Sequence, residues 1–371
     1  MRKDLVGVNV PALRSHNAAL VLDLLRTAGE SGISRLELAE RTGLTPQAVS
    51  KITARLRAEG LAAEAGHRAS TGGKPRTVLR LVPSAAYAVG IHLDRDELTA
   101  LLTDLAGTTL AARRRPVDLG AGAGPVLDVV TEEVRELLDG FPPGGSAREA
   151  APTPGAVPAP GTLLGVGVAM PGPLDHRAGV PGRVTGFPEW AGHPVRDELA
   201  ARLGLPVVLD KDTNAAALGL ALRPGAPGSF AYVHLGTGLG AGLVLGGAPL
   251  RGDRTGAGEL GHQTVQLDGP PCGCGGRGCL EVLCLAAVAR GELAEAARIL
   301  GTGAANLVRL LDIDQVLLGG RVVLAAPEVF AEGVREVLGG LGLTAPVGLA
   351  TGPDAVAEGA AWLTLAPVFG K

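Results

Sequence analysis

A histidine and three cysteines gather in the segment GHQTVQLDGPPCGCGGRGCLE, as His262, Cys272, Cys274 and Cys279. Three thiolates and an imidazole form the soft, tetrahedral ligand set that zinc prefers. The thiols of a Cys-x-Cys pair are poorly placed to bridge each other, so a disulfide is the weaker interpretation. Because all four ligands would come from the protein, the pattern predicts a closed, structural zinc site. Cys284 lies outside the pattern, on a predicted helix, and we expect it in the core.

A carboxylate stands where a strand gives way to a helix in LPVVLDKDTNAAALG. Asp212 closely follows the apolar run PVVLD, and side chains at such a position project into a cleft. An aspartate there can accept a proton or a hydrogen bond from a sugar hydroxyl. Asp followed by Thr and Asn is also typical of a helix cap, so both interpretations stay open.

Glycines repeat in HLGTGLGAGLVLGG, at Gly236, Gly238, Gly240 and Gly242. The backbone N–H groups that such a turn exposes can cradle a phosphate. Close-packed hairpins use the same residues, so the turn alone is weak support for a phosphate site.

The elements that position a second kind of chemistry lie in residues 14–60, where we expect three helices. The first covers residues 16–28, and the second covers residues 35–41 with Ser34 as its N-cap and Glu37 completing a capping box. Gly43 permits the left-handed turn that ends the second helix. Thr45 caps the third helix, and Pro46 takes its first position, where a missing N–H costs nothing.

The third helix has one apolar face and one polar, basic face. Val49, Ile52 and Leu56 share the apolar face. The opposite face is short and basic, as a helix in the major groove requires, and it carries Gln47, Ser50, Lys51 and Ala54.

We expect two strands, over residues 61–64 and 77–82, on either side of the tip GHRASTGGKPR. This pattern predicts a wing that follows the phosphate backbone or enters the minor groove. A solvated basic loop is the alternative. Together these features predict a winged helix-turn-helix. The candidate DNA contacts are Thr45, Gln47, Ser50, Lys51, Arg55, Lys74 and Arg76.

The distribution of charge agrees with this prediction. Residues 1–82 carry thirteen Lys/Arg and seven Asp/Glu, a net charge of +6, which leaves −9 for the rest of a chain whose total is −3. A basic head on an acidic body favours a polyanionic partner. No apolar run is long enough to span a membrane, and the start lacks the pattern of a signal peptide, so we expect a cytoplasmic protein without membrane contact.

From residue 87 onward, short strands alternate with helices, which indicates an α/β body. AVGIHLDRDELTALLTDLAG alternates like the strands of a meander, helices are expected over residues 126–138 and 195–203, and VLLGG reads as a buried strand. Residues 141–162 are rich in Pro, Gly and Ala without apolar periodicity, which predicts a flexible surface insertion.

Together these segments resemble the ROK family, whose members are sugar kinases and sugar-responsive repressors. The Cys-x-Cys-Gly-x-x-Gly-Cys-Leu-Glu block is highly specific, and an N-terminal winged helix marks the repressor branch. The resemblance implies a winged helix-turn-helix followed by two actin-like ATPase lobes of the ribonuclease H type, with a cleft between them. It covers nearly the whole chain, in order, through GVGVAMPGPLD, FPEWAGHPV, LPVVLDKDTNAAALG, HLGTGLGAGLVLGG, GAGELGHQTV, CGCGGRGCLE, ANLVRLLDIDQVLLGG and AVAEGAAWL.

The resemblance also assigns roles to residues of the cleft. Asp212 takes the place of the catalytic base, and Glu259, His262 and Glu281 look like the sugar-contacting set, His262 also binding zinc. Lys211 replaces an Asn of the family. As a donor only, Lys211 either favours a phosphorylated or acidic sugar or forms an ion pair with Asp210 or Glu259, and both alternatives stay open.

Other departures argue against a kinase. The family's Asp-x-Gly-Gly-Thr turn falls on GIHLDRDEL, where His92 replaces the Asp and Asp94, Arg95 and Asp96 replace Gly-Gly-Thr. Carboxylates there repel nucleotide phosphates, and side chains block the backbone N–H groups. The stretch from residue 282 to 303 is shorter than in most relatives, and Arg321 adds bulk where relatives keep a small residue near adenine.

We therefore expect a transcriptional regulator, most simply a homodimeric repressor, or a tetramer, that binds an operator in double-stranded DNA and a sugar or sugar-phosphate effector. Zinc is the expected cofactor and ATP is not; Asp212 is then a vestigial base. The alternatives are a glucokinase-like, ATP-dependent sugar kinase and a constitutive DNA-binding protein with a vestigial cleft. The expected domains are the DNA-binding domain at 1–82, the first lobe at 83–208 with a C-terminal helix at 354–371 packed back on it, and the second lobe with the zinc site at 209–353.

Overall fold

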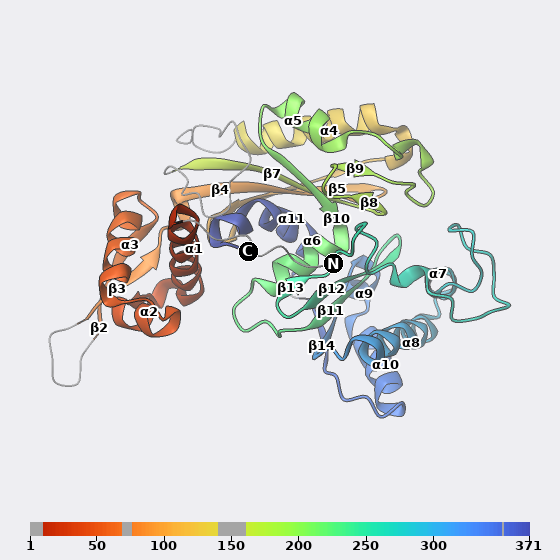
Figure 1. The fold of residues 1–371 in the computed structure, drawn as a ribbon. Helices are drawn as coiled ribbons and strands as arrows, with labels where there is room; N and C mark the ends of the chain where they lie inside the picture. Colours follow the sequence, from red (N-terminus) through yellow and green to blue (C-terminus); the bar gives the residue numbers. More distant parts are fainter. Residues whose placement is uncertain (1–9, 69–75, 140–160, 351) are drawn as a thin grey trace.

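The computed structural model describes residues 10–68, 76–139, 161–350 and 352–371 of the chain. A small N-terminal domain lies beside a larger body that contains two five-stranded sheets, one above the other in Figure 1. None of the described helices is long and apolar enough to cross a membrane.

The N-terminal domain is built as the capping signals predict. The side chain of Ser34 accepts a hydrogen bond from the N–H of Glu37, whose carboxylate accepts from the N–H of Ser34, which confirms the capping box. Gly43 ends the second helix in the left-handed region, at φ 69°. The helices are α1 (Val10–Ala28), α2 (Arg35–Thr42) and α3 (Pro46–Ala58), and the sheet β1-β3-β2 contains β1 (Ile33–Ser34), β2 (Ala62–Arg68) and β3 (Arg76–Leu81).

The upper sheet of Figure 1 has the order β10-β7-β4-β5-β6. The predicted meander is present, since β4 (Ala86–Leu93), β5 (Glu97–Asp104) and β6 (Thr109–Pro116) pair antiparallel, while β7 (Thr162–Met170) and β10 (Val207–Lys211) extend the sheet in parallel. Helices α4 (Ala123–Asp139) and α5 (Val195–Leu203) cover one face, and α11 (Ala355–Leu365) packs on the other (Figure 1). The two short strands β8 (Leu174–Asp175) and β9 (Val180–Pro181) pair beside this sheet.

The lower sheet has the order β13-β12-β11-β14-β15. Its strands are β11 (Phe230–Leu235), β12 (Leu239–Leu245), β13 (Ala248–Pro249), β14 (Gln315–Gly319) and β15 (Val347–Leu349). Residues alternate between its two faces: Phe230 and Tyr232 pack toward α6 (Asp212–Ala221), while Ala231 and Val233 pack into a separate core. The helices of that core are α7 (Leu280–Ala289), α8 (Leu293–Leu311) and α10 (Pro327–Gly340), with α9 (Arg321–Ala325) nearby.

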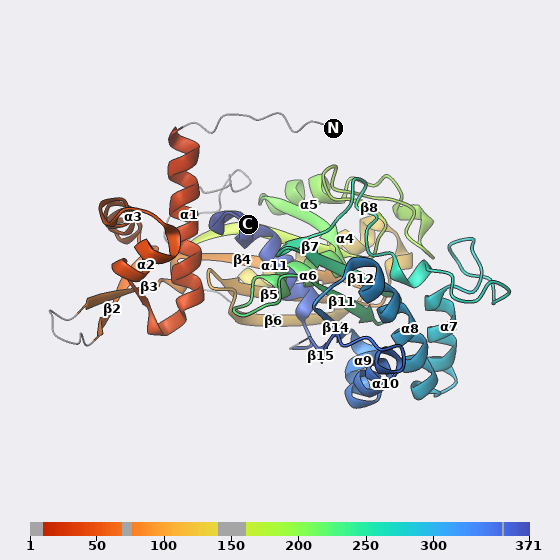
Figure 2. The ribbon, with the colours of Figure 1, turned by 60° about the horizontal axis from the view of Figure 1, so that its bottom comes forward.

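Helices α6 and α11 lie side by side between the two sheets (Figures 1 and 2). Their contact requires glycine, because a Cβ on Gly359 would overlap the carbonyl oxygen of Ala215 and a Cβ on Gly219 would meet Gly359. Close backbone approach of this kind fixes the two helices as one unit.

Several boundaries differ from the predictions. The first helix begins at Val10 rather than at residue 16, and Pro11 lies in its first turn, where a missing N–H costs nothing. The helix after PVVLD begins at Asp212, two residues before the expected Asn214. The insertion predicted at 141–162 and the tip of the wing lie largely outside the described residues, although Thr162 already belongs to β7.

Candidate functional site

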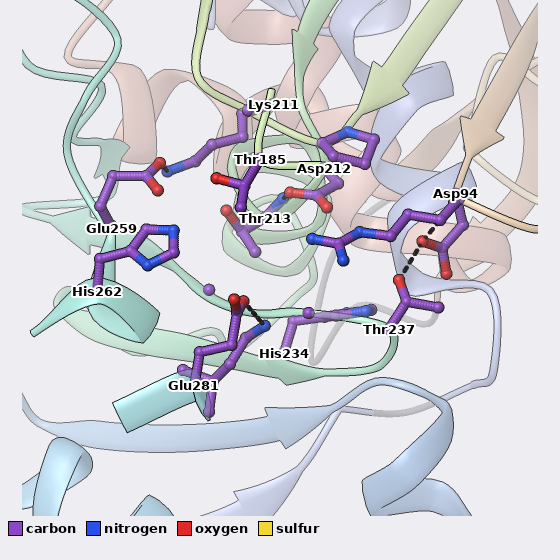
Figure 3. A pocket seen from close by; sticks show the side chains of 16 residues that line it. Asp94, Thr185, Lys211, Asp212, Thr213, His234, Thr237, Glu259, His262 and Glu281 are labelled. Atoms are coloured by element: carbon purple, nitrogen blue, oxygen red, sulfur yellow. Dashed lines mark hydrogen bonds and ion pairs between the residues drawn. The ribbon is translucent and has the colours of Figure 1, made fainter. Parts of the chain in front are cut away.

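A pocket opens between the two sheets of the body, and its lining residues come from both (Figure 3). The cavity itself measures about 60 Å³, and its empty space reaches about 550 Å³ when the open mouth is included. All five residues predicted to contact the sugar, which are Lys211, Asp212, Glu259, His262 and Glu281, line this pocket.

Asp212 owes its place in the pocket to the junction of β10 and α6. The strand ends at Lys211 and the helix begins at Asp212, whose carboxylate accepts a hydrogen bond from the N–H of Thr213 at 2.6 Å. Burial raises the pKa of Asp212 to about 7, and the Lys211 ammonium partly offsets this effect. A carboxyl group with a pKa near 7 can accept or return a proton at neutral pH.

This raised pKa predicts a stability that depends on pH. The folded-state pKa lies above the ordinary value of 3.8, so the ionised carboxylate destabilises the folded protein at high pH, and the penalty fades as the pH falls from about 7 to about 4. We expect Asp212→Asn to raise the free energy of unfolding by about 2 kcal/mol at pH 8 and to change it little near pH 4. Urea unfolding at both pH values measures this, with Asp253→Asn on an exposed loop as the control; an equal effect at both would contradict it.

Lys211 is buried and makes an ion pair inside the pocket wall. Its Nζ donates to the carboxylate of Glu259 at 3.0 Å and to the carbonyl oxygen of Ala257 at 2.6 Å. Asp210, the other predicted partner, pairs instead with Arg251 at 2.6 Å. Of the two alternatives for Lys211, the ion pair with Glu259 is therefore the one that the structure contains.

Glu281 and His262 form the wall opposite Asp94 (Figure 3). The carboxylate of Glu281 accepts a hydrogen bond from the N–H of Leu239 at 2.8 Å, which holds it against the glycine turn between β11 and β12. His262 belongs both to the pocket and to the cysteine cluster, so any metal bound there also orients a pocket residue.

The four predicted zinc ligands converge. The ligand atoms of His262, Cys272, Cys274 and Cys279 all lie within 4.8 Å of one another. Cys274 Sγ and Cys279 Sγ are 3.7 Å apart, as are Cys272 Sγ and His262 Nδ1. A tetrahedral ion with Zn–S bonds of about 2.3 Å separates its sulfurs by roughly 3.8 Å, so the donor set fits zinc. Cys284 is fully buried, as expected for a core residue.

The turn between β4 and β5 belongs to the upper sheet, and its side chains contact residues of the other lobe. The carboxylate of Asp94 accepts a hydrogen bond from the hydroxyl of Thr237 at 2.7 Å, and Asp96 forms an ion pair with Arg321 at 2.6 Å. Arg321, predicted to crowd an adenine site, thus ties the two lobes together. Between the two aspartates, Arg95 lines the pocket.

The second candidate surface is the outer face of α3. Val49 and Leu56 are buried with Leu25 and Leu38, and Ile52 packs against this core. The opposite face is exposed at Gln47, Ser50, Lys51, Ala54 and Arg55, and the N-cap Thr45 is exposed as well. Arg76 is exposed at the start of β3, whereas Lys74 lies outside the described residues.

The sequence did not single out several residues of the pocket. Arg95, Thr185 and His234 line it, and Arg251 forms an ion pair with Asp210, the residue before Lys211. For Arg95 a signal was present, because it stands in the turn that departs from the family's pattern. His234 begins the glycine segment HLGTGLGAGLVLGG but drew no attention itself, and Thr185 carries no motif. Only the folded chain brings both to the pocket.

Comparison with known proteins agrees with this architecture. Residues 156–289 match the model of the ROK family, and residues 21–62 match a winged helix-turn-helix DNA-binding model. A xylose repressor of Caldicellulosiruptor bescii is 25% identical over 89% of each chain. The ROK hexokinase of Thermus thermophilus is 32% identical, with a TM-score of 0.59 over 76% of this chain and 99% of its own. A ROK family transcriptional regulator, homologous to the MLC protein of E. coli, is 22% identical with a TM-score of 0.74 over 96% of this chain and 97% of its own.

The fold therefore defines a winged helix-turn-helix protein with a two-lobed, actin-like α/β body of the sugar-kinase type. The chain belongs to the ROK family.

Proposed function

We propose that this protein is a sugar-responsive transcriptional repressor that binds operator DNA through α3 and the wing, and a sugar or sugar derivative in the pocket between its lobes. The observation that carries the proposal is the pairing of an exposed, polar and basic face on α3 with a pocket lined by Asp212, Glu259 and Glu281. Repressors among the relatives support it. A cytoplasmic homodimer, with two α3 helices one turn of DNA apart, suits a two-fold symmetric operator.

Helix α6 is the proposed route from the pocket to the DNA-binding domain. Asp212 at its first residue lines the pocket, and the carbonyl oxygen of Leu222, just past its end, accepts a hydrogen bond from Arg26 of α1 at 2.8 Å. A sugar that binds one lobe arrangement more tightly shifts the equilibrium between arrangements by its differential affinity. Movement of α6 then reaches α1 through this contact.

In this proposal the protein does not transfer phosphate. Asp94 and Asp96 place two carboxylates in the turn that would have to face a nucleotide, and both are tied to the other lobe through Thr237 and Arg321. The rival function is a sugar kinase, favoured by the raised pKa of Asp212 and by the hexokinase relative. Sugar-dependent release of ADP that Asp212→Asn abolishes would establish the kinase instead.

A zinc ion held by His262, Cys272, Cys274 and Cys279 completes the proposal. With four protein ligands, the ion contributes folding free energy and leaves no open position for catalysis.

Equilibrium binding to the DNA upstream of its own gene tests the proposal. The zinc-loaded protein is titrated against that DNA, with and without a panel of sugars and sugar phosphates, at two salt concentrations. Sequence-specific, salt-sensitive binding that one sugar changes is the expected result. Specific binding indifferent to every sugar would indicate a vestigial pocket, and the absence of specific binding would refute the regulator.

Lys51→Ala is expected to weaken operator binding about tenfold and to reduce the slope of log affinity against log salt by about one, because an exposed ammonium on α3 is lost. Fluorescence anisotropy with labelled DNA measures both quantities. Arg298→Ala, on the exposed face of α8 in the second lobe, is the control. Unchanged affinity of Lys51→Ala would exclude α3 as the reading helix.

A further inference from the structure

We propose that the pocket is specific for phosphorylated sugars, with Arg95 as the residue that binds the phosphate. This inference rests on the proposed function, because it names the class of sugar that the same pocket takes.

Among the cationic side chains that line the pocket, Arg95 is the one without an ionic partner in the described part of the chain. Lys211 is neutralised by Glu259, and burial lowers the pKa of His234 to about 4, which keeps that imidazole neutral. The guanidinium of Arg95, by contrast, makes no ion pair or hydrogen bond with any residue that the structure describes. A guanidinium in a small pocket can donate several parallel hydrogen bonds to one anion, and a phosphate accepts them well.

The position of the Arg95 guanidinium in the pocket is constrained by the residues around it. Its neighbours on both sides are anchored to the opposite lobe, Asp94 to Thr237 and Asp96 to Arg321. The guanidinium lies 5.8 Å from the ring centre of Phe187. It also approaches the glycine turn so closely that a Cβ on Gly238 would lie 3.2 Å from Nη2. Glycine at this position therefore leaves room for the arginine.

The carboxylates nearest to this place have partners of their own. Asp94 accepts from Thr237 and faces Arg321, and Glu281 accepts from the N–H of Leu239. On the same wall, the N–H groups of Thr237 and Gly238 make no backbone hydrogen bond within the described part of the chain. A phosphate has three oxygens for such donors, whereas a carboxylate has two, so the arrangement favours a phosphate ester.

The resulting orientation is specific. In this proposal the sugar ring faces Glu259 and His262, which lie together in Figure 3, and the phosphate-bearing carbon faces Arg95 of the same pocket. Because Lys211 already pairs with Glu259, the anion that the sequence offered as one alternative for Lys211 is assigned to Arg95 instead.

Isothermal titration calorimetry on the zinc-loaded full chain tests the inference. The probes are matched pairs, glucose with glucose 6-phosphate and N-acetylglucosamine with its 6-phosphate, together with xylose, glucuronate and inorganic phosphate. For at least one pair we expect the phosphate ester to bind at least tenfold more tightly than its parent sugar. Arg95→Gln is expected to remove that preference, so that the phosphate ester and its parent sugar bind with similar affinity, and Arg95→Lys to retain part of it. Arg254→Gln, an exposed arginine outside the pocket, is the matched control.

The other outcomes separate this inference from the proposed function. Tight binding of neutral sugars without a preference for phosphate overturns the inference and leaves the proposed function intact. A preference for glucuronate over every phosphate ester overturns the phosphate assignment, as does a phosphate preference that survives in Arg95→Gln. No binding by any sugar of the panel overturns both.

Discussion

Cys274→Ser is expected to abolish zinc binding and to lower the free energy of unfolding by about 4 kcal/mol or more. The variant removes one of four ligand atoms that lie within 4.8 Å of one another, and a structural zinc site contributes its binding free energy to folding. The loop of residues 263–279 has few apolar side chains in the core, so a bound ion would add strongly to the backbone hydrogen bonds that hold it. Because His262 also lines the pocket, sugar affinity should fall with the metal.

Elemental analysis and chemical denaturation measure the two effects. Cys284→Ala is the matched control, since this buried cysteine lies on α7 outside the ligand set and should keep one zinc per chain. Full zinc content in Cys274→Ser would contradict the assignment of the ligands.

Arg26→Ala is expected to destabilise the junction between the DNA-binding domain and the body by about 3 kcal/mol. The side chain of Arg26 is only 6% exposed, and it donates to the carboxylate of Asp23 and to the carbonyl oxygen of Leu222. Its guanidinium also lies 4.9 Å from the ring centre of Trp362 and 5.3 Å from that of Phe369. Removing one partner of a buried, hydrogen-bonded pair typically costs about 3–5 kcal/mol of stability. The expected loss lies at the lower end of this range because Lys371, 3.1 Å from Asp23, still neutralises that carboxylate.

Urea denaturation measures this effect when unfolding is monitored with one probe in the N-terminal domain and a second probe in the body. Arg26→Lys keeps the charge but loses the planar stack, so an intermediate loss is expected. Arg41→Ala, exposed on α2, is the control. In the regulator that we propose, Arg26→Ala should also reduce the sugar-induced change in DNA affinity, because the contact between α1 and α6 is lost. A change in stability below about 0.5 kcal/mol would show that the junction does not depend on Arg26.

The sequence by itself determined the features that depend on neighbours along the chain. The capping box of Ser34 and Glu37 and the proline that opens α3 are satisfied by residues three or four positions away, so a local pattern suffices to predict them. The cluster of His262 and three cysteines is similar, because its cysteines share one short loop. Alternating strands and helices likewise predicted the α/β body, since period and polarity are read directly from the chain.

Only the tertiary structure decided which distant charges meet. Lys211 had two candidate partners in the sequence, and the choice of Glu259 depends on how the loop before η5 (Leu260–His262) returns to β10. The sequence placed Arg95 in an altered turn without giving its partners and gave no sign of the role of Arg26, yet Arg95 lines the pocket and Arg26 is buried between α1 and the C-terminal segment. The physical reason is that the stability of a charge depends on burial and on partners in space, which sequence spacing does not encode for residues distant along the chain.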